Sequence, residues 1–290
     1  MRHVSLALVI VLAGTAAAAP VTFPPDTVYV PIRCGGTPMY DTYRDQPGFI
    51  DDGDVVGTAT SPAALRASDA TNLYLRIRLD GDPAPNQTLH PTSWGIEADL
   101  NGNHADYELL ILVDGAPGKN VVELFKNDAI TSANSPADPA TQPPLATYPF
   151  ADNARSVMAG GGETGTNPDF YLDFAVPWAD LRAAGLDHAT HTRFWAGSST
   201  TSDSLNGDLA CHDGASGTAT LDGTVSDDTT GDPADDPGNG SGSGSGNNGT
   251  LELEGGGGCS TTGGSVSPLV ALGLIALVRR RRLTHDPRTR

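Results

Sequence analysis

Five side chains with oxygen atoms that can bind a metal follow one another closely near the middle of the chain: Asp99, Asn101, Asn103, Asp106 and Glu108. Proteins bind calcium mainly through carboxylate and amide oxygens, and the first three of these residues are spaced by two, as in a calcium-binding loop. The pattern departs from helix-flanked calcium loops because Gly102 comes directly after Asn101. Asn and Gly are also the residues that a tight hairpin turn requires. The segment therefore predicts either a calcium site or a hairpin turn, and calcium is the one cofactor that we expect.

A second group of residues could hold a sugar ring. Alternation along three expected strands places five side chains on the face opposite the apolar one: Glu97, Tyr171, Asp173, Arg193 and Trp195. A sugar ring stacks on an aromatic plane while its hydroxyl groups bond to nearby carboxylates. These residues therefore predict a carbohydrate-binding face, with a surface polysaccharide as partner. The alternative is that Tyr171 and Trp195 are ordinary core or rim residues.

Other reactive residues point to no catalytic site. His188 and His191 are three positions apart, a spacing that can bring two imidazoles to one metal ion. No third ligand is evident nearby, so a solvated loop is the favoured interpretation. The sequence contains no G-x-S-x-G, P-loop or H-E-x-x-H motif. We therefore expect no catalytic residues and no enzyme activity.

The periodicity of the chain predicts that these residues lie on short strands. Residues 73–79 alternate strictly between apolar and polar side chains, and residues 94–100 do the same. Residues 107–113 are apolar on both faces, which indicates a central, buried strand. Further strands are expected at residues 27–32, 121–126, 155–158, 170–176 and 192–198.

One short helix interrupts the strands. Pro177 is suited to open it, residues 178–184 form it, and Gly185 ends it. No long amphipathic helix and no internal repeat is evident. Residues 19–212 therefore predict one all-β, jelly-roll-like sandwich.

Two cysteines lie near the two ends of this segment. Cys34 and Cys211 would form a disulfide in an oxidising compartment, and two separate thiols are the alternative. The expected bond closes a long loop, which stabilises the fold by roughly 4–5 kcal/mol in the chain-entropy model.

Both ends of the chain carry targeting signals. Residues 1–18 have a basic start, an apolar stretch and small residues at the expected cleavage site, which predicts a secretory signal peptide. The apolar run at residues 268–278 is shorter than the roughly 20 residues that span a bilayer. The residues expected to sort or anchor the tail are Cys259, Arg279, Arg280, Arg281 and Arg282.

The tail of residues 259–282 resembles a known sorting signal. Cys259 in a glycine-rich stretch, the apolar run and the arginine cluster are similar to the MYXO-CTERM signal of myxobacterial surface proteins. The resemblance implies that an intramembrane sorting protease processes the tail and leaves the protein on the cell surface, associated with the outer membrane. Residues 283–290 continue past the arginines and are expected on the cytoplasmic side. A plain single-pass membrane anchor is the alternative.

Composition separates a linker from the sandwich. Residues 213–258 are rich in Gly, Ser, Pro and Asp and are predicted to be a disordered, acidic spacer. The whole chain has a net charge of −18. The part between the two signals is more acidic still, because Arg2, Arg288, Arg290 and residues 279–282 fall outside it. Such a charge excludes nucleic acid as an expected partner.

A second resemblance concerns the sandwich. The strands of residues 72–100, the Asn101-Gly102 turn and the segment of residues 170–181 are similar to carbohydrate-binding module family 9-like and DOMON-like domains. These families imply a non-catalytic binding sandwich, sometimes with structural calcium. The leading hypothesis is a cell-surface binding or adhesion module. The alternatives are a structural envelope protein without a small ligand and a secreted hydrolase with an unrecognised site.

Overall fold

The computed structural model describes residues 19–46, 48–49, 51–103, 105–160, 164–165, 167–211, 221, 228–230 and 233 of the 290-residue chain. The predicted signal peptide (1–18), most of the predicted linker, the sorting tail with Cys259 and Arg279, Arg280, Arg281 and Arg282, and residues 283–290 lie outside the described residues. Within the described part, no helix has the length and apolar character that crossing a membrane requires.

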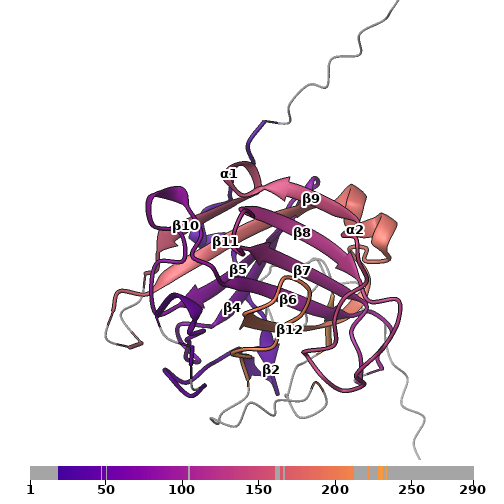
Figure 1. Ribbon diagram of the computed structural model, residues 1–290, viewed down its shortest axis with the longest axis horizontal. Coiled ribbons are helices and arrows are strands. Elements are labelled where there is room, and N and C mark those ends of the chain that lie inside the picture. Colours follow the sequence, from indigo (N-terminus) through magenta and orange to yellow (C-terminus); the bar gives the residue numbers. More distant parts are fainter. Residues whose placement is uncertain are drawn as a thin grey trace, which may run out of the picture. The chain divides into compact units, whose positions relative to one another are not determined.

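Two antiparallel sheets form the body of the described chain (Figure 1). The first sheet has the strand order β1 (Val30–Pro31), β4 (Ala64–Ser68), β5 (Asn72–Leu79), β11 (Phe170–Pro177) and β10 (Ala154–Met158). The second has the order β13 (Asp228–Thr230), β12 (His191–Ser199), β6 (Ser93–Asp99), β7 (Leu109–Asp114), β8 (Val121–Lys126) and β9 (Ala146–Pro149). A small separate hairpin pairs β2 (Arg33–Cys34) with β3 (Thr37–Pro38). The prediction of an all-β sandwich is confirmed.

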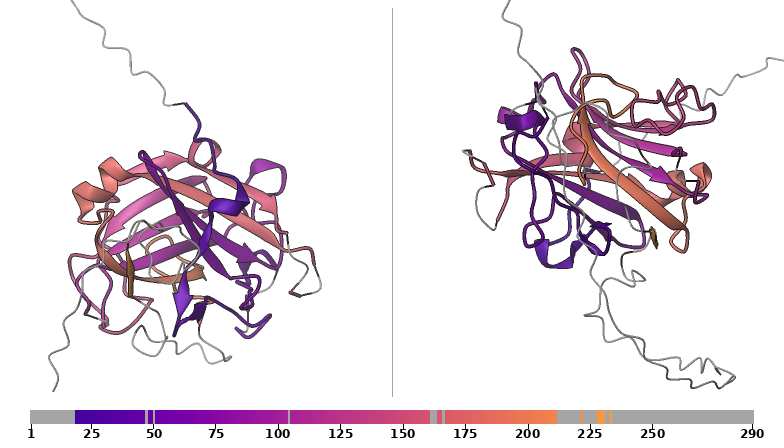
Figure 2. Two further views of the ribbon diagram at one scale, coloured as in Figure 1. Left: turned by 180° about the vertical axis from the view of Figure 1, so that it is seen from behind. Right: turned by 90° about the horizontal axis from the view of Figure 1, so that it is seen from below.

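The main core lies between the two sheets, which the second view of Figure 2 shows as separate layers. In β5 the side chains Leu73, Leu75, Ile77 and Leu79 all point into this core, as their alternation predicts. In β6 the inward side chains are Trp94, Ile96 and Ala98. β7 is fully buried between β6 and β8, which confirms the prediction of a central strand.

The outer face of each sheet is also covered. On the second sheet, a smaller apolar cluster forms around Tyr107, Phe125 and Trp195 and includes Leu205 and Leu209 from the segment after β12. On the first sheet, another cluster contains Tyr29, Tyr74 and Tyr171, against which Val21 and Phe23 of the N-terminal segment pack. The outward side chains of both sheets are therefore largely removed from solvent.

Several short helices connect the strands. The α-helix α2 covers Trp178–Ala184 as predicted, and Gly185 ends it with a φ of 111°, which a residue without a side chain adopts at little cost. The sequence did not indicate α1 (Phe150–Asn153), a single turn, or the 3₁₀ turns η2 (Asp51–Gly53) and η3 (Pro85–Gln87). The 3₁₀ turn η1 (Asp26–Val28) shortens the strand expected at residues 27–32.

The two ends of the sandwich sequence meet. A disulfide joins Cys34 to Cys211 with a Cα–Cα distance of 6.2 Å, which confirms the predicted pairing. Two further features fall within the segment predicted as a linker. The backbone of β13 pairs with β12, and Leu221 is buried in the cluster around Trp195. A strand at this position covers the otherwise open edge of β12, which explains why it forms there.

Candidate functional site

The residues predicted to form a sugar-binding face lie on the outer faces of two different sheets. Glu97 and Trp195 are directly opposed on β6 and β12, and Arg193 on β12 is paired in register with Asp99. Tyr171 and Asp173 lie on β11 of the other sheet, in register with Arg78 and Arg76. The predicted strand faces are right, but the five side chains do not come together. Glu97, Asp173 and Trp195 have no exposed area, because loops cover both outer faces.

Asp173 belongs to a buried ion-pair network. Its carboxylate accepts hydrogen bonds from Nη2 of Arg76 and from Nε of Arg155, both at 2.9 Å. The Arg76 guanidinium also lies 4.3 Å from the ring centre of Tyr171 and 3.9 Å from that of Tyr29. The network joins β5, β10 and β11 beneath the N-terminal segment, so its contacts are structural.

Glu97 is a buried carboxyl group on the opposite outer face. The N–H of Leu205 approaches the carboxyl group and acts to lower its pKa, but neither oxygen has a hydrogen bond of good geometry in the described part of the structure. Burial raises its pKa well above the usual value, and the nearby charge of Asp138 acts in the same direction. Glu97 therefore favours the protonated form over a wide range of pH.

The predicted calcium loop uses its oxygens to bond the backbone. Oδ1 of Asp99 accepts from the N–H groups of Asn101 and Gly102 at 2.9 and 2.7 Å, and Oε2 of Glu108 accepts from Leu100 N–H at 2.6 Å. Oδ1 of Asn101 accepts from Asn103 N–H at 2.7 Å. Gly102 has a φ of 77°, as a turn requires.

Two oxygens of this loop remain buried without a described partner, Oδ2 of Asp99 and Oδ1 of Asp106. Among the described residues the loop does not bring three acidic, histidine or cysteine ligands together. The hydrogen bonds show the turn, and calcium binding at this loop stays a prediction.

The two histidines proposed as metal ligands lie at separate structural positions. The ring of His188 stacks on that of Trp178 with 3.9 Å between ring centres. His191 is the first residue of β12 and is exposed. Among the described residues, neither histidine lies in a cluster of three possible metal ligands.

Two adjoining pockets form a groove that the sequence did not indicate. The first has a volume of about 340 Å³, and half-buried Phe170, Asp51 and Asn167 line it. The second has a volume of about 430 Å³ and is lined by Phe49 and Thr200, among others. Asp52 and His90 line both pockets, so the two adjoin. We call this surface the rim groove.

The polar groups of the rim groove are held in place by hydrogen bonds. Oδ1 of Asp51 accepts from the Arg44 guanidinium at 3.1 Å and from Nδ2 of Asn167 at 3.0 Å. Oδ2 of Asp52 lies 3.1 Å from Nδ1 of His90. These contacts orient carboxylate oxygens along a groove that has an aromatic ring in each pocket.

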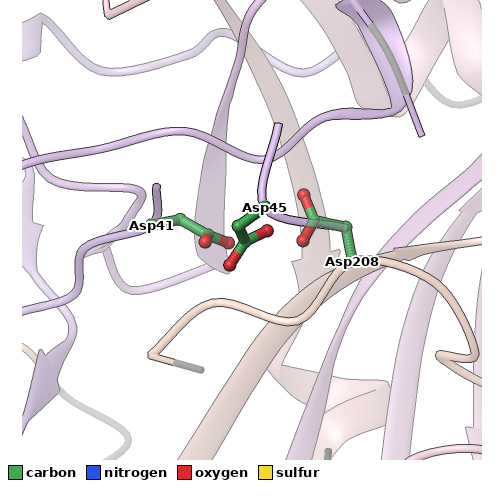
Figure 3. Close-up of side chains that lie close together, drawn as sticks. All are labelled: Asp41, Asp45 and Asp208. Carbon is green, nitrogen blue, oxygen red and sulfur yellow. The ribbon is translucent and has the colours of Figure 1, made fainter. Parts of the chain in front are cut away.

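Three carboxyl groups meet next to this region. Asp41, Asp45 and Asp208 each offer one oxygen, and these oxygens all lie within 4.8 Å of one another. Figure 3 shows the Asp41 and Asp208 carboxyl groups on either side of that of Asp45. Oδ1 of Asp41 accepts from Thr42 N–H at 2.8 Å, and Oδ2 of Asp208 accepts from Val55 N–H at 2.7 Å. We call this group the aspartate cluster.

Burial dominates the electrostatics of the aspartate cluster. Asp41 and Asp208 are each 2% exposed. Burial, together with the charge of Asp208, raises the pKa of Asp41 well above its usual value. Burial, together with the charge of Asp45, raises the pKa of Asp208 to about 8. Carboxylates in such a site need a proton or a cation to offset their charge.

Sequence reasoning missed both the rim groove and the aspartate cluster. Asp208 is more than 150 residues from Asp41 and Asp45, and no spacing pattern links them. One signal was present, since residues 41–54 contain five aspartates without a strand pattern. Phe170 lies at the start of β11, where it is half-buried in the groove.

No family model, curated protein or solved structure matches the chain. The resemblances of the tail to the MYXO-CTERM signal and of the body to family 9-like modules therefore stay predictions.

Proposed function

We propose that this chain is an exported, non-catalytic binding module that displays a carbohydrate-binding groove on the outside of the cell envelope. The expected export signals, the acidic linker and the Cys34–Cys211 disulfide support the location, because such disulfides persist in oxidising compartments. In this proposal a sorting protease acts on the tail at Cys259, and the tail connects the module to the membrane.

The rim groove is the observation that carries the proposal. It places the half-buried rings of Phe170 and Phe49 in adjoining pockets, with Asp52 and His90 shared between them. Pockets that bind small molecules have volumes of about 300–1,000 Å³ and combine apolar surface with a few fixed polar groups. Two such pockets in succession suit neighbouring residues of a polysaccharide better than one isolated small molecule.

The chemistry of the lining matches the hydroxyl groups of a sugar. Each ring offers a flat apolar surface for a sugar face. The oxygens of Asp51 and Asp52 are fixed by Asn167 and His90 and retain acceptor capacity, since an ionised carboxylate accepts several hydrogen bonds. The acidic lining repels phosphate, so nucleic acid is not the expected ligand.

The proposal excludes hydrolysis for a chemical reason. A glycosidase needs one carboxyl group as a proton donor and a second as a base or nucleophile on the two sides of the bond. In the rim groove Asp51 is bonded to Arg44 and Asn167, and Asp52 is bonded to His90. Both carboxyl groups are therefore held by neighbouring side chains, and binding without cleavage is expected.

The test is carbohydrate binding by the purified domain and its linker. We would screen a glycan array that includes bacterial surface polysaccharides and then measure affinity for the best ligand by calorimetry. Phe170→Ala and Phe49→Ala should each weaken binding about two- to tenfold, because an aromatic stacking contact contributes roughly 0.5–1.5 kcal/mol. Ile130→Ala is a matched control, since Ile130 is a large exposed apolar residue that does not line the groove.

Three results would contradict the proposal. The first is that no carbohydrate binds, which would favour a structural envelope protein. The second is that both phenylalanine variants bind as well as the wild type. The third is the release of new reducing ends during incubation, which would favour the hydrolase.

A further inference from the structure

The aspartate cluster has the dimensions of a cation site. The ligand oxygens of Asp41, Asp45 and Asp208 all lie within 4.8 Å of one another. Calcium–oxygen distances in proteins are about 2.3–2.6 Å, so two oxygens bound to one calcium ion are at most about 5 Å apart. One ion placed between the three carboxyl groups in Figure 3 can therefore contact all of them.

A second observation points to a ligand at this place. Asp41 is 2% exposed, and its Oδ2 has no hydrogen-bond partner in the described structure. Its carboxyl group is directed toward Asp45 in Figure 3. A buried oxygen without a partner costs about 1–3 kcal/mol, and more when charged, unless something occupies the space in front of it.

Two members of the cluster, Asp41 and Asp208, are surrounded by negative rather than positive charge. Neither Asp41 nor Asp208 forms an ion pair with a described Lys, Arg or His, and the charges that act on both come from other aspartates. Asp54, which has no exposed area, adds another buried carboxyl group near Asp208. The Arg44 guanidinium is directed to Asp51 of the rim groove instead.

We propose that Asp41, Asp45 and Asp208 bind one divalent cation, and that calcium is the ion. All three ligands are carboxylates, which favours calcium, magnesium or manganese over zinc or copper. A buried magnesium site requires shorter distances and a strict octahedron, whereas calcium accepts irregular sets of protein oxygens. The ion site is independent of carbohydrate binding and goes beyond the proposed function.

The ion would join two distant parts of the chain. Asp41 and Asp45 lie in the segment that leads to Val55, and Asp208 lies in the segment that follows β12. Asp208 already bonds to Val55 N–H, and Cys211 N–H donates to Tyr40 O at 3.0 Å. The Cys34–Cys211 disulfide joins the same two segments covalently, and the cation would join them by ionic contacts.

The test measures calcium binding to the protein of residues 19–258 after treatment with EDTA. Calorimetry should show one saturable calcium site, with a Kd of about 10⁻³ M or lower, as in extracellular calcium modules. Calcium should raise the melting temperature, because an ion that binds only the folded state stabilises it. Asp41→Asn and Asp208→Asn should each weaken binding at least tenfold and remove most of the melting shift.

The controls separate this site from other acidic positions. Asp128→Asn changes an exposed aspartate and should leave both measurements unchanged. If either buried variant does not fold, Asp45→Asn, which changes the least buried member, replaces it. Absence of saturable binding at several millimolar calcium would overturn the proposal. Binding that survives Asp45→Asn and Asp208→Asn but is lost in Asp106→Asn would assign the ion to the loop of residues 99–108 and would equally overturn it.

Discussion

At the scale of single residues, buried ion pairs affect the stability of the fold more than exposed ion pairs do. Asp173 has no exposed area and holds Arg76, which is 1% exposed, through two hydrogen bonds. Arg182 and Asp187, by contrast, form an exposed pair with 4.0 Å between their charged atoms. Removing one member of a buried pair leaves an uncompensated charge, whereas an exposed pair contributes little.

We therefore expect Asp173→Asn to lower the free energy of unfolding by about 3–5 kcal/mol, because Arg76 loses its buried partner and keeps the ion pair with exposed Asp26. The matched control is Asp187→Asn, which should change it by less than about 1 kcal/mol. Urea unfolding followed by tryptophan fluorescence measures both. Equal effects of the two substitutions would show that the Arg76 network is not a main source of stability.

Glu97 makes stability depend on pH. Its folded-state pKa is raised above the usual value by burial, so the folded state binds this proton more tightly than the unfolded state. Proton binding to Glu97 therefore stabilises the fold fully at a pH below the pKa that Glu97 has in the unfolded chain. This stabilisation is lost as the pH rises toward the higher pKa of Glu97 in the folded protein.

Glu97→Gln keeps the shape and removes the titration. We expect the variant to have a melting temperature close to that of the wild type at about pH 5 and a clearly higher one at about pH 9. Thermal unfolding in buffers across this range provides the measurement. A constant difference at all pH values would mean that Glu97 does not titrate between the folded and unfolded states in this way.

At the scale of elements, the segment of residues 41–54 connects the two candidate sites. It carries Asp41 and Asp45 of the aspartate cluster, and Phe49, Asp51 and Asp52 of the rim groove. It contains no strand of either sheet, so its conformation depends on contacts with other parts of the chain.

Exposed Arg44 lies within this segment and offers a trypsin site. If a cation holds Asp41 and Asp45 in place, trypsin should cut after Arg44 several times faster in EDTA than in calcium, because local opening exposes the bond. Cleavage after Arg182 in α2 is an internal control and should not change. Peptide mass spectrometry over a time course gives both rates, and equal acceleration at the two sites would indicate global loosening instead.

The disulfide closes a loop across almost the whole sandwich. Cys34 and Cys211 are separated by 177 positions, and the chain-entropy model assigns about 5 kcal/mol to a loop of this size. The double variant Cys34→Ser with Cys211→Ser should therefore unfold at a clearly lower urea concentration. Wild-type protein with a reducing agent should behave like the variant. An unchanged midpoint in both would contradict this role for the bond.

The sequence predicted most of the inner architecture because inner residues follow the period of the strand. Leu73 to Leu79, the buried strand β7 and the helix α2 with Gly185 all follow from local patterns and are confirmed. The strands β4 and β9 were missed, since their short sequences have little alternation.

The candidate sites depend on contacts between distant segments, which no local pattern encodes. The alternation of side chains along the strands correctly placed Tyr171 and Trp195 on outward faces. It contains no information about the loops that cover these faces. Asp208 lies beside Asp41 and Asp45 in the fold although more than 150 residues separate them along the chain. For the same reason the rim groove, which combines Phe49 and Phe170, was not predicted.

At the scale of the whole molecule, we propose that the acidic sandwich is displayed outside the cell. The net charge of −18 and a disulfide between the ends of the domain are both expected of a solvated surface protein. The proposed display, carbohydrate binding and cation site all require that residues 19–211 meet the external medium.

Protease shaving of intact cells, followed by mass spectrometry without reduction, tests this claim most directly. The account predicts that peptides of the sandwich are released from intact cells, that the first residue of the mature chain is Ala19, and that the peptides containing Cys34 and Cys211 remain linked. Release only after cell lysis, with Met1 still present and both cysteines as free thiols, would contradict it.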